Sequence, residues 1–310
     1  MAAKIGVFPA SGALASSIVN HSMKFFPASR LVLVARSPEK LTEWNQLGAT
    51  IRKADYDDHS TLNGVFDGVE TLMLISYASF EIEHRVNVHR AAIDAAIRSG
   101  VKHIFYTSLG FAGNLTDDSV THVMGAHLQT ERYLSQLTDK ITYTSVREGL
   151  YSESFPLYIG WFSLQNPADE ITIPHSGTGP GVTWVKRDEL GEGTAKLIYS
   201  FVTNPASFQY LNKNVLLTGP REISLLETVN IFGRLIGKSL KIREIAVEDY
   251  LLLPQVRGKY VYHGVDLSRE WTTTWQGLRN GECAVVSPSL KEILGREPEE
   301  FETTIKALLG

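Results

Sequence analysis

The sequence predicts an α/β fold, in which a doubly wound parallel Rossmann sheet is joined to a smaller, mixed α/β C-terminal substrate lobe. Through the first half of the 310 residues, short apolar runs alternate with segments whose apolar residues recur at helical spacing. Such alternation favours a parallel sheet with right-handed crossovers and helices on both faces. After Gly149 the alternation gives way to aromatic and irregular segments, which indicates a second, smaller unit.

The expected strands of the first half are short apolar runs bounded by turn or helix signals. They lie at 4–8, 30–36, 49–56, 70–76, 101–108 and 140–148. The segments between them are expected to be helices, at 13–25, 37–48, 60–69, 86–100 and 122–137. Leu14, Ile18 and Val19 share one face of the first helix, and Ser37 and Gly48 supply start and stop signals for the second.

The second half of the chain returns to the sheet before it forms the substrate lobe. The expected elements are a loop at 175–181, a helix at 187–201, a core strand at 214–220, a helix at 221–238, and a strand followed by a helix within 240–253. Asp188 is the expected N-cap of the first of these helices. We therefore expect residues 1–150 with 183–219 to form the NAD(P)-binding Rossmann domain, and 151–182 with 220–310 to form the substrate-binding lobe.

The first strand is followed by the loop FPASGALAS, at the position where dinucleotide-binding folds hold a pyrophosphate. Gly12 is retained from the usual glycine pattern, but Pro9 and Ala15 replace the other two glycines. Proline fixes φ and removes one N–H, whereas the amides of Gly12, Ala13 and Leu14 remain available to a phosphate at the helix N-terminus. The loop by itself also fits an ordinary strand-to-helix turn.

The end of the second strand gives a clue to which nucleotide is bound. An NAD-binding fold carries a carboxylate at this position, whereas an NADP-binding fold carries an arginine. The sequence has Arg36, followed by Lys40, with no acidic residue before Glu39. A guanidinium can pair with a 2′-phosphate through two parallel hydrogen bonds. We therefore expect NADP(H), with a solvated surface cation as the alternative role of Arg36.

The order of motifs resembles the NmrA-like family of atypical short-chain dehydrogenases/reductases, most closely its type-2 quinone oxidoreductase branch. The matching stretches are FPASGALAS, VARSPEK, ADYDD, GVETLMLIS, GVKHIFYTSL, YTSVREGLYSE and LLTGP with SLLETVNIFGRLIGK, in that order over nearly the whole chain. The resemblance implies a Rossmann core, a smaller C-terminal lobe and a preference for NADP(H). Members of the family include small-molecule reductases and regulators that bind the nucleotide without turning it over.

Carried over by position, the resemblance implies a row of cofactor contacts. They are Gly12, Ala13 and Leu14 at the pyrophosphate, Arg36 and Lys40 at the adenosine phosphate, Asp55 and Tyr56 at the adenine, Ser76 and Tyr77 along the ribose, and Thr107 and Ser108 near the nicotinamide. Phe8 stands where relatives have a small polar residue, and Glu148 where they have asparagine. A carboxylate near a nicotinamide would favour the oxidised ring by charge attraction, or would serve as a catalytic acid or base.

Four residues are candidates for the catalytic chemistry. Tyr151 follows a strand end and is the proton donor that we would test first, with a packed aromatic as the alternative. His127 and Glu131 lie one helical turn apart, which fits either an oriented acid–base histidine or a pair on the helix surface. Ser108 could donate a hydrogen bond to a carbonyl oxygen or cap a helix. Glu148 is the fourth. The sequence places no third ligand for a metal beside His127 and Glu131.

Three functions remain open at this stage. The first, favoured by the resemblance, is NADPH-dependent reduction of a small carbonyl, quinone or enone compound, with a setting in secondary metabolism. The second is proton-transfer chemistry without redox, such as dehydration, aldol cleavage or isomerisation. The third is an NADP(H)-sensing regulator. An aromatic set in the second half suggests a planar or polycyclic substrate, although its spacing also fits core packing: Phe155, Tyr158, Trp161, Phe162 and Trp184.

Charge and composition limit the partners. The net charge is -4 and the pI is near 6.2, so we expect neither nucleic acid nor an anionic membrane as a partner. No apolar run approaches the roughly 20 residues that span a bilayer. Cys283 is the only cysteine, which fits a reducing compartment and a cytoplasmic location. A homodimer is compatible with the sequence.

Overall fold

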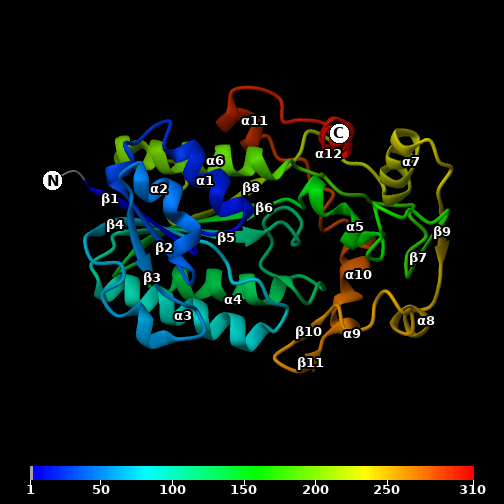
Figure 1. Ribbon diagram of the computed structural model, residues 1–310, viewed down its shortest axis with the longest axis horizontal. Helices are drawn as coiled ribbons and strands as arrows, with labels where there is room; N and C mark the ends of the chain where they lie inside the picture. The colour runs from blue at the N-terminus through cyan, green and yellow to red at the C-terminus, as the bar shows by residue number, and fades with distance from the viewer. Residues whose placement is uncertain (1–2) are drawn as a thin grey trace.

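The computed structural model describes residues 3–310 and contains a seven-stranded parallel sheet with the strand order β3-β2-β1-β4-β5-β6-β8 (Figure 1). This confirms the predicted fold class. The strands of the sheet are β1 (Lys4–Phe8), β2 (Leu31–Ala35), β3 (Thr50–Lys53), β4 (Val69–Leu74), β5 (His103–Leu109), β6 (Thr142–Glu148) and β8 (Lys213–Leu217). The strand order reverses between β1 and β4, and open parallel sheets bind ligands at such a switch point.

Helices cover both faces of the sheet because alternate strand residues are apolar on each side. Leu31 and Leu33 of β2 pack in the cluster that includes α1 (Ala13–Ser22) and α6 (Arg187–Thr203). Val32 and Val34 pack in the opposite cluster, with residues of the two helices on the other face. Those two helices are α3 (Ile82–Arg98) and α4 (Met124–Ser135), seen below the sheet in Figure 1.

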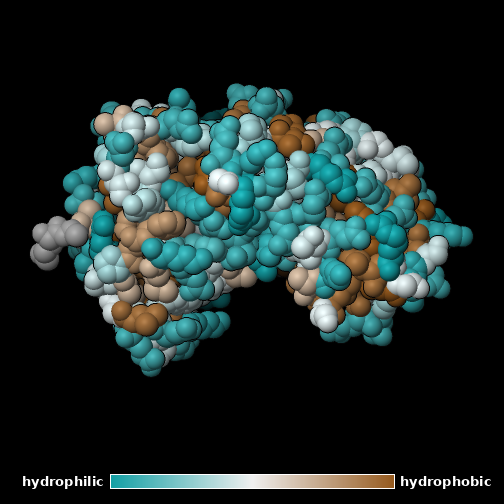
Figure 2. Space-filling view, turned by 90° about the horizontal axis from the view of Figure 1, so that it is seen from above, coloured by the Kyte–Doolittle hydropathy of each residue, from teal (hydrophilic) through white to brown (hydrophobic). Residues whose placement is uncertain are grey.

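The smaller lobe is built from short elements around an aromatic core. Its strands form a parallel pair, β7 (Glu170–Ile173) with β9 (Lys241–Glu244), and an antiparallel hairpin, β10 (Val261–Tyr262) with β11 (Val265–Asp266). The remaining helices are α2 (Thr42–Gln46), α5 (Phe155–Tyr158), α7 (Leu225–Ile236), α8 (Val247–Leu251), α9 (Ser268–Trp271), α10 (Thr273–Arg279), α11 (Ser289–Leu294) and α12 (Phe301–Leu309). Figure 2 shows the surface hollowed between this lobe and the part that carries the main sheet.

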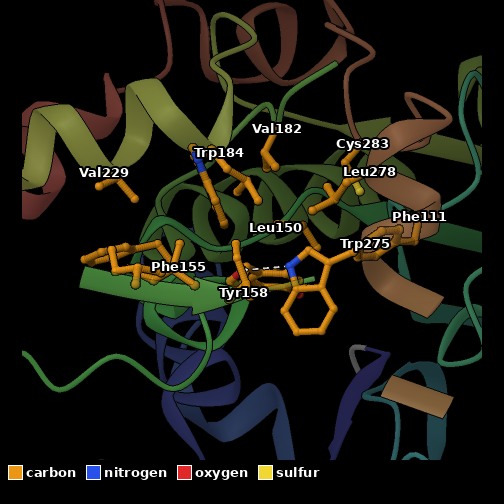
Figure 3. Packing of buried hydrophobic residues seen from close by; sticks show 14 of the residues in the cluster. Phe111, Leu150, Phe155, Tyr158, Val182, Trp184, Val229, Trp275, Leu278 and Cys283 are labelled. Carbon is orange, nitrogen blue, oxygen red and sulfur yellow. Dashed lines mark hydrogen bonds between the residues drawn. The ribbon is translucent and has the colours of Figure 1, made fainter. Parts of the chain in front are cut away.

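The core of the smaller lobe contains much of the aromatic set that the sequence singled out. Phe155, Tyr158 and Trp184 are buried together with Trp275, as Figure 3 shows. The indole of Trp275 donates a hydrogen bond to the carbonyl oxygen of Tyr158 (3.2 Å), and that of Trp184 donates to Thr228 (2.9 Å). These aromatic residues therefore form the core of the lobe. The two indoles can be buried there because each has a hydrogen-bond acceptor within reach.

Two expected elements differ in the structure. Residues 60–69 do not form an α-helix: a 3-10 turn covers His59–Leu62, and turns follow. Gly64 and Gly68 take positive φ values of 65° and 77°, which interrupts a helix in so short a segment. Asp188 is not the N-cap of α6, because the helix begins one residue before it, at Arg187.

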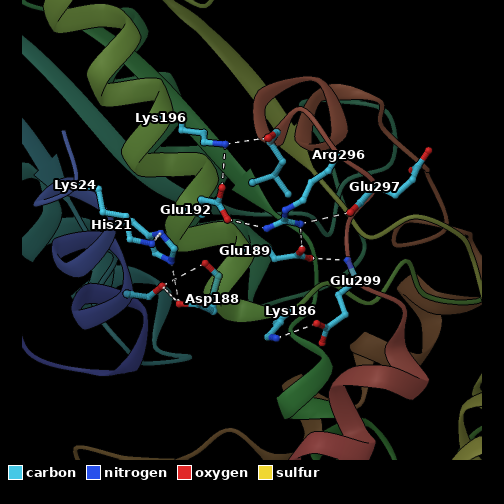
Figure 4. A network of polar contacts seen from close by, with 12 residues as sticks. His21, Lys24, Lys186, Asp188, Glu189, Glu192, Lys196, Arg296, Glu297 and Glu299 are labelled. Atoms are coloured by element: carbon cyan, nitrogen blue, oxygen red, sulfur yellow. Dashed lines mark hydrogen bonds and ion pairs between the residues drawn. The ribbon is translucent and has the colours of Figure 1, made fainter.

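Asp188 instead connects the two helices on one face of the sheet. Its carboxylate accepts hydrogen bonds from the hydroxyl of Ser17 (2.6 Å) and Nε2 of His21 (3.2 Å), both on α1. The next residue, Glu189, accepts from the backbone N–H of Glu299 (2.7 Å) and pairs with Arg296, so it anchors the C-terminal segment (Figure 4). No helix among the described residues is both long and apolar enough to cross a membrane.

Candidate active site

Two adjoining cavities lie at the switch point, at the carboxyl ends of the strands. The first, of about 350 Å³, is lined by Phe8, Pro9, Ser11, Arg36, Ala54, Asp55 and Tyr56. The second, of about 340 Å³, is lined in part by Leu14, Arg85, Thr107, Ser108, His127, Glu148 and Tyr151. The segment from Ile75 to Ala78, which follows β4, lines both cavities. An elongated ligand could therefore pass from one cavity to the other over this segment.

Phe8 and Pro9 line the first cavity without filling it. The Phe8 ring is turned into the core, where its centroid lies 4.4 Å from that of Tyr56 and 5.8 Å from that of Phe66. The Phe8–Pro9 peptide bond is cis. Tyr56 is held by a hydrogen bond from its hydroxyl to the carbonyl oxygen of Ile75 (2.8 Å). The aromatic residue at the end of β1 thus packs beneath the cavity, which leaves space above it.

The N-terminus of α1 fits a phosphate. Gly12 is the N-cap and has φ 118°, a conformation that side chains disfavour. The first intrahelical bond runs from Ser16 N to Gly12 O (2.8 Å), so the amides of Ala13, Leu14 and Ala15 precede the helical ladder. The first turn contains no acidic residue and no side chain caps it. Free amides and the helix dipole together favour an anion at this end.

The cations expected at the adenosine phosphate are both exposed. The side chain of Arg36 is 71% exposed, and its Nε lies 3.9 Å from a carboxylate oxygen of Asp55. At that distance and exposure the ion pair is weak, so the guanidinium remains free to bind an anion. Lys40 lies on the 3-10 turn Pro38–Leu41 and is not among the residues that line the cavity.

Backbone amides of the segment after β4 are tied to the neighbouring elements. The N–H of Ser76 donates to the hydroxyl oxygen of Thr107 on β5 (2.8 Å), and the N–H of Tyr77 donates to Nε2 of His89 on α3 (2.9 Å). The Tyr77 hydroxyl donates to Asp57 (2.9 Å). These bonds fix the wall that the two cavities share.

Ser108 and Glu131 belong to a buried ion-pair network. The guanidinium of Arg147 donates to both carboxylate oxygens of Glu131, at 2.9 and 2.6 Å, and the Ser108 hydroxyl donates to the first of them (2.6 Å). Glu131 therefore does not orient His127, and the two residues are not a surface pair either, because both are buried. The Ser108 proton is already engaged, although its oxygen can still accept a hydrogen bond.

His127 is held neutral in the wall of the second cavity. Nη2 of Arg85 donates to its Nε2 (2.8 Å), so Nδ1 carries the proton and lies 3.1 Å from the Tyr106 hydroxyl. Burial and the nearby Arg85 charge hold the pKa of His127 well below its usual range. A neutral ring with both nitrogens engaged is a poor proton donor near pH 7.

Tyr151 and Glu148 form a buried pair that faces the second cavity. The Tyr151 hydroxyl donates to Oε2 of Glu148 (2.5 Å), while Oε1 of Glu148 is buried without a hydrogen-bond partner. Burial raises the pKa of Glu148 from 4.5 to about 8, despite the opposing hydrogen bond from Tyr151. Burial, and then the charge of Glu148, raise the pKa of Tyr151 well above its usual range. The carboxyl therefore carries a proton at neutral pH and can release it near pH 8.

Sequence reasoning did not select Arg85 or Phe80, which both line the second cavity. Arg85 lies in the first turn of α3, and Phe80, Tyr262 and Trp271 form an aromatic wall from three separate segments. The signal for Arg85 was its place soon after β4, because a helix that follows a strand begins at the ligand edge of the sheet.

One group among the described residues could hold a metal. Asp57, His84 and His263 offer ligand atoms that all lie within 4.8 Å of one another. In the structure these groups are engaged in two pairs, His84 with Asp57 (2.8 Å) and His263 with Glu81 (2.6 Å).

Comparisons with known proteins agree with this geometry. The profile of the NmrA-like family matches residues 1–275. An NmrA-like family domain-containing oxidoreductase of Aspergillus flavus, flvB, is 30% identical over 306 residues, covering 97% of this chain and 93% of the relative. Quinone oxidoreductase 2 of Escherichia coli is 39% identical over 151 residues, about half of each chain (49% and 50%).

Solved structures resemble the whole chain. The NADPH-dependent quinone oxidoreductase QOR2 of Escherichia coli, complexed with NADPH, superposes with a TM-score of 0.78 at 25% identity, covering 99% of this chain and 100% of that one. The triphenylmethane reductase of Citrobacter sp., complexed with NADP(H), gives 0.77 at 24% identity, with 98% and 99% covered. The second likeness shows the shared fold.

Proposed function

The chain belongs to the NmrA-like family of atypical short-chain dehydrogenases/reductases and is an oxidoreductase, and on that premise we propose that it uses NADPH to reduce a small carbonyl, quinone or enone compound. The names of two relatives, a quinone oxidoreductase and an oxidoreductase of Aspergillus flavus, support the activity. A role in secondary metabolism and a cytoplasmic location are part of the proposal, the latter supported by the single, buried and free Cys283. A homodimer stays a prediction.

The residues of the first cavity and of α1 fit NADP(H). Gly12 has the positive φ of a close approach, the amides of Ala13 and Leu14 are free for the pyrophosphate, and Arg36 is exposed where a 2′-phosphate would lie. Tyr56 and Asp55 line the space for the adenine. A bound nicotinamide would supply the hydride, and the protein would position it against the substrate.

The observation that carries the proposal is the Glu148–Tyr151 pair in the second cavity. Reduction of a carbonyl or quinone adds one hydride and one proton, and a protonated carboxyl with a pKa of about 8 is a competent proton source at neutral pH. For this transfer the 2.5 Å hydrogen bond would reverse, so that Oε2 of the protonated Glu148 donates to the Tyr151 oxygen. Tyr151 would then pass its hydroxyl proton to the substrate oxygen and take up the Glu148 proton, which leaves Glu148 ionised until solvent protonates it again. The donor pair stands in place of the tyrosine and lysine of the larger reductase superfamily.

The walls of the second cavity support an aromatic or polycyclic substrate. Tyr158, Trp271 and Tyr262 line it together with Phe80, and the rings of Phe80 and Trp271 stack at 5.0 Å. Flat aromatic walls bind flat, apolar ligands by burying their surface. The solved structure of a triphenylmethane reductase is compatible with such a substrate, although it resembles this chain in fold alone.

The test measures NADPH oxidation with 1,4-naphthoquinone as the probe, in the wild-type protein and in the variants Tyr151→Phe and Glu148→Gln. Both substitutions keep the shape of the side chain and remove the acidic proton. We expect kcat to fall by roughly 100-fold in each, the usual scale for a lost general acid, while the affinity for NADPH stays unchanged. Wild-type kcat should decline as the pH rises through about 8, and Glu148→Gln should lose this decline.

Other outcomes would favour the other functions. Glu148 stands where the family resemblance implies asparagine, and its pKa of about 8 also suits proton-transfer chemistry without redox. Absence of NADPH binding at millimolar concentrations would favour that chemistry. Tight NADPH binding without oxidation by any quinone or enone tested would instead favour a sensor of the nucleotide.

A further inference from the structure

A buried cation without an acidic partner lies in the wall of the second cavity. Arg85 is 6% exposed, and its Nη2 donates to the Ser76 hydroxyl (2.7 Å) and to Nε2 of His127 (2.8 Å). Its Nε is buried without a hydrogen-bond partner. Among the described residues no ion pair includes Arg85. Its two hydrogen-bond acceptors, the hydroxyl of Ser76 and the imidazole of His127, are both neutral.

Arg147, the other buried arginine near the sheet, shows how a cation is compensated in this fold. Arg147 is 1% exposed, and Glu131 neutralises it through two hydrogen bonds. Burying a charge without a partner is strongly unfavourable. No negative charge near Arg85 offsets the cost of burying it. The nearby side chains that favour its charge are tyrosines, among them Tyr106 and Tyr262, and burial raises their pKa values, so they stay neutral.

One nitrogen of the Arg85 guanidinium is left free to bind a ligand. Nη2 is occupied and Nε is enclosed, whereas Nη1 has no hydrogen-bond partner and is not among the enclosed atoms. Arg85 lines the second cavity, so Nη1 is the nitrogen that meets the cavity space. The acid group of the same cavity, Glu148, is protonated at neutral pH by its own burial and leaves the charge of Arg85 unbalanced.

We propose that Arg85 binds an anionic oxygen of the substrate, which assigns the substrate to planar aromatic compounds that carry a carboxylate, phenolate or enolate. This rests on the proposed function, because it deepens the assignment of the second cavity. The phosphates of the cofactor have their own donors at α1 and Arg36 on the first cavity. A guanidinium held by two neutral acceptors retains its charge for such an oxygen, and the hydrogen bond is charge-assisted.

The experiment compares two ligands that differ in charge at one oxygen. 2-Hydroxy-1,4-naphthoquinone is an anion at neutral pH, and its 2-methoxy analogue is neutral. Binding to the NADP⁺ complex is measured by quenching of tryptophan fluorescence, so that no turnover takes place. We expect the wild-type protein to bind the anion at least 10-fold more tightly than the methoxy compound, and Arg85→Gln to lose this preference.

Two further variants keep the test informative. Arg85→Lys keeps the charge and should retain part of the preference, even if the loss of the planar fork weakens binding. Arg98→Gln removes an exposed cation from the far end of the same helix and should leave the preference intact. Far-ultraviolet circular dichroism shows whether each variant has folded.

Three results would overturn the proposal. The wild-type protein could show no preference for the anion, or bind neither compound at millimolar concentration. Arg85→Gln could weaken both compounds equally, which would make the residue a packing element. It could also weaken NADPH as strongly as the anion, which would assign the cation to the cofactor. Because binding is read without turnover, these results are independent of whether 1,4-naphthoquinone is reduced.

Discussion

Arg147 and Glu148 are neighbours on β6, yet the fold uses them for different purposes. Consecutive side chains of a strand point to opposite faces. Arg147 reaches Glu131 on α4 and forms a closed ion pair, whereas Glu148 is left with one phenol and an unpartnered oxygen in a cavity wall. In this position Glu148 can hold a proton and supply it to the cavity. Arg147 supports the sheet beside it.

We expect Arg36 to determine the preference between NADPH and NADH. If it binds the 2′-phosphate, Arg36→Ala should weaken NADPH binding by about 10- to 100-fold, the scale of a lost charge-assisted hydrogen bond, and leave NADH almost unchanged. Titration of each reduced cofactor by its fluorescence measures both affinities. Lys53→Ala, which removes an exposed cation from the end of β3, is the control. Equal losses for NADPH and NADH would remove the assignment.

Single residues were predictable where the backbone pattern fixed their place. Leu14 lies in the first turn of the helix after β1, Thr107 lies near the end of β5, and Tyr151 comes three residues after β6. Each lines the second cavity. The pairing of side chains was not predictable in the same way. The spacing of His127 and Glu131 fitted either an oriented acid–base histidine or a pair on the helix surface, and the structure shows neither. Arg85 of α3 instead binds His127, and Arg147 of β6 binds Glu131. Such competition depends on tertiary contacts, which sequence spacing does not contain.

At the level of elements, the packing of α1 on α6 depends on a very close approach. Gly191 of α6 lies against Ser17 of α1: a Cβ added at Gly191 would stand 2.1 Å from the Ser17 Oγ and 2.6 Å from its Cβ. The Ser17 hydroxyl is fixed there by its bond to Asp188 (2.6 Å). The two helices therefore have no room for a methyl group at this contact, and α1 carries the proposed phosphate site.

Gly191→Ala should destabilise the protein despite the better helix propensity of alanine. Overpacking costs about 1–3 kcal/mol, against a gain of up to about 1 kcal/mol from propensity. We expect a net loss of about 1–2 kcal/mol in the free energy of unfolding, measured in urea. Ser200→Ala, an exposed position on the same helix, should be neutral or slightly stabilising. An equally stable Gly191→Ala would show that the helices can separate without cost.

Elements of the Rossmann part were more predictable than those of the smaller lobe. All six strands expected in the first half occur, and most of them are short apolar runs between turn signals. β3, with the sequence TIRK, is the exception. The 60–69 segment failed as a helix because two glycines adopt positive φ in it. In the smaller lobe, β10 and β11 contain two residues each, and such short pairs have no periodicity for a sequence to display.

For the molecule as a whole, buried titratable groups couple the site to stability. Glu148 has a raised pKa, so the folded state binds its proton more tightly than the unfolded state does. The free energy of unfolding then falls as the pH rises from about 4.5 to about 8, where the unfolded chain has already lost the proton. His103 and His127 have lowered pKa values. At acid pH the unfolded chain therefore binds more protons at these histidines than the folded state does, and the free energy of unfolding falls as the pH is lowered.

The Glu148 contribution can be isolated by difference. Glu148→Gln removes this one titration and leaves the histidines unchanged, so the stability of the variant minus that of the wild type should rise between pH 6 and pH 9. With a folded pKa of about 8, the rise is about 3 kcal/mol at one pKa unit per roughly 1.4 kcal/mol. Urea unfolding at both pH values gives the four free energies. A difference that stays constant would mean that Glu148 is ionised in the folded protein at neutral pH, and the carboxyl would then be no proton source for Tyr151.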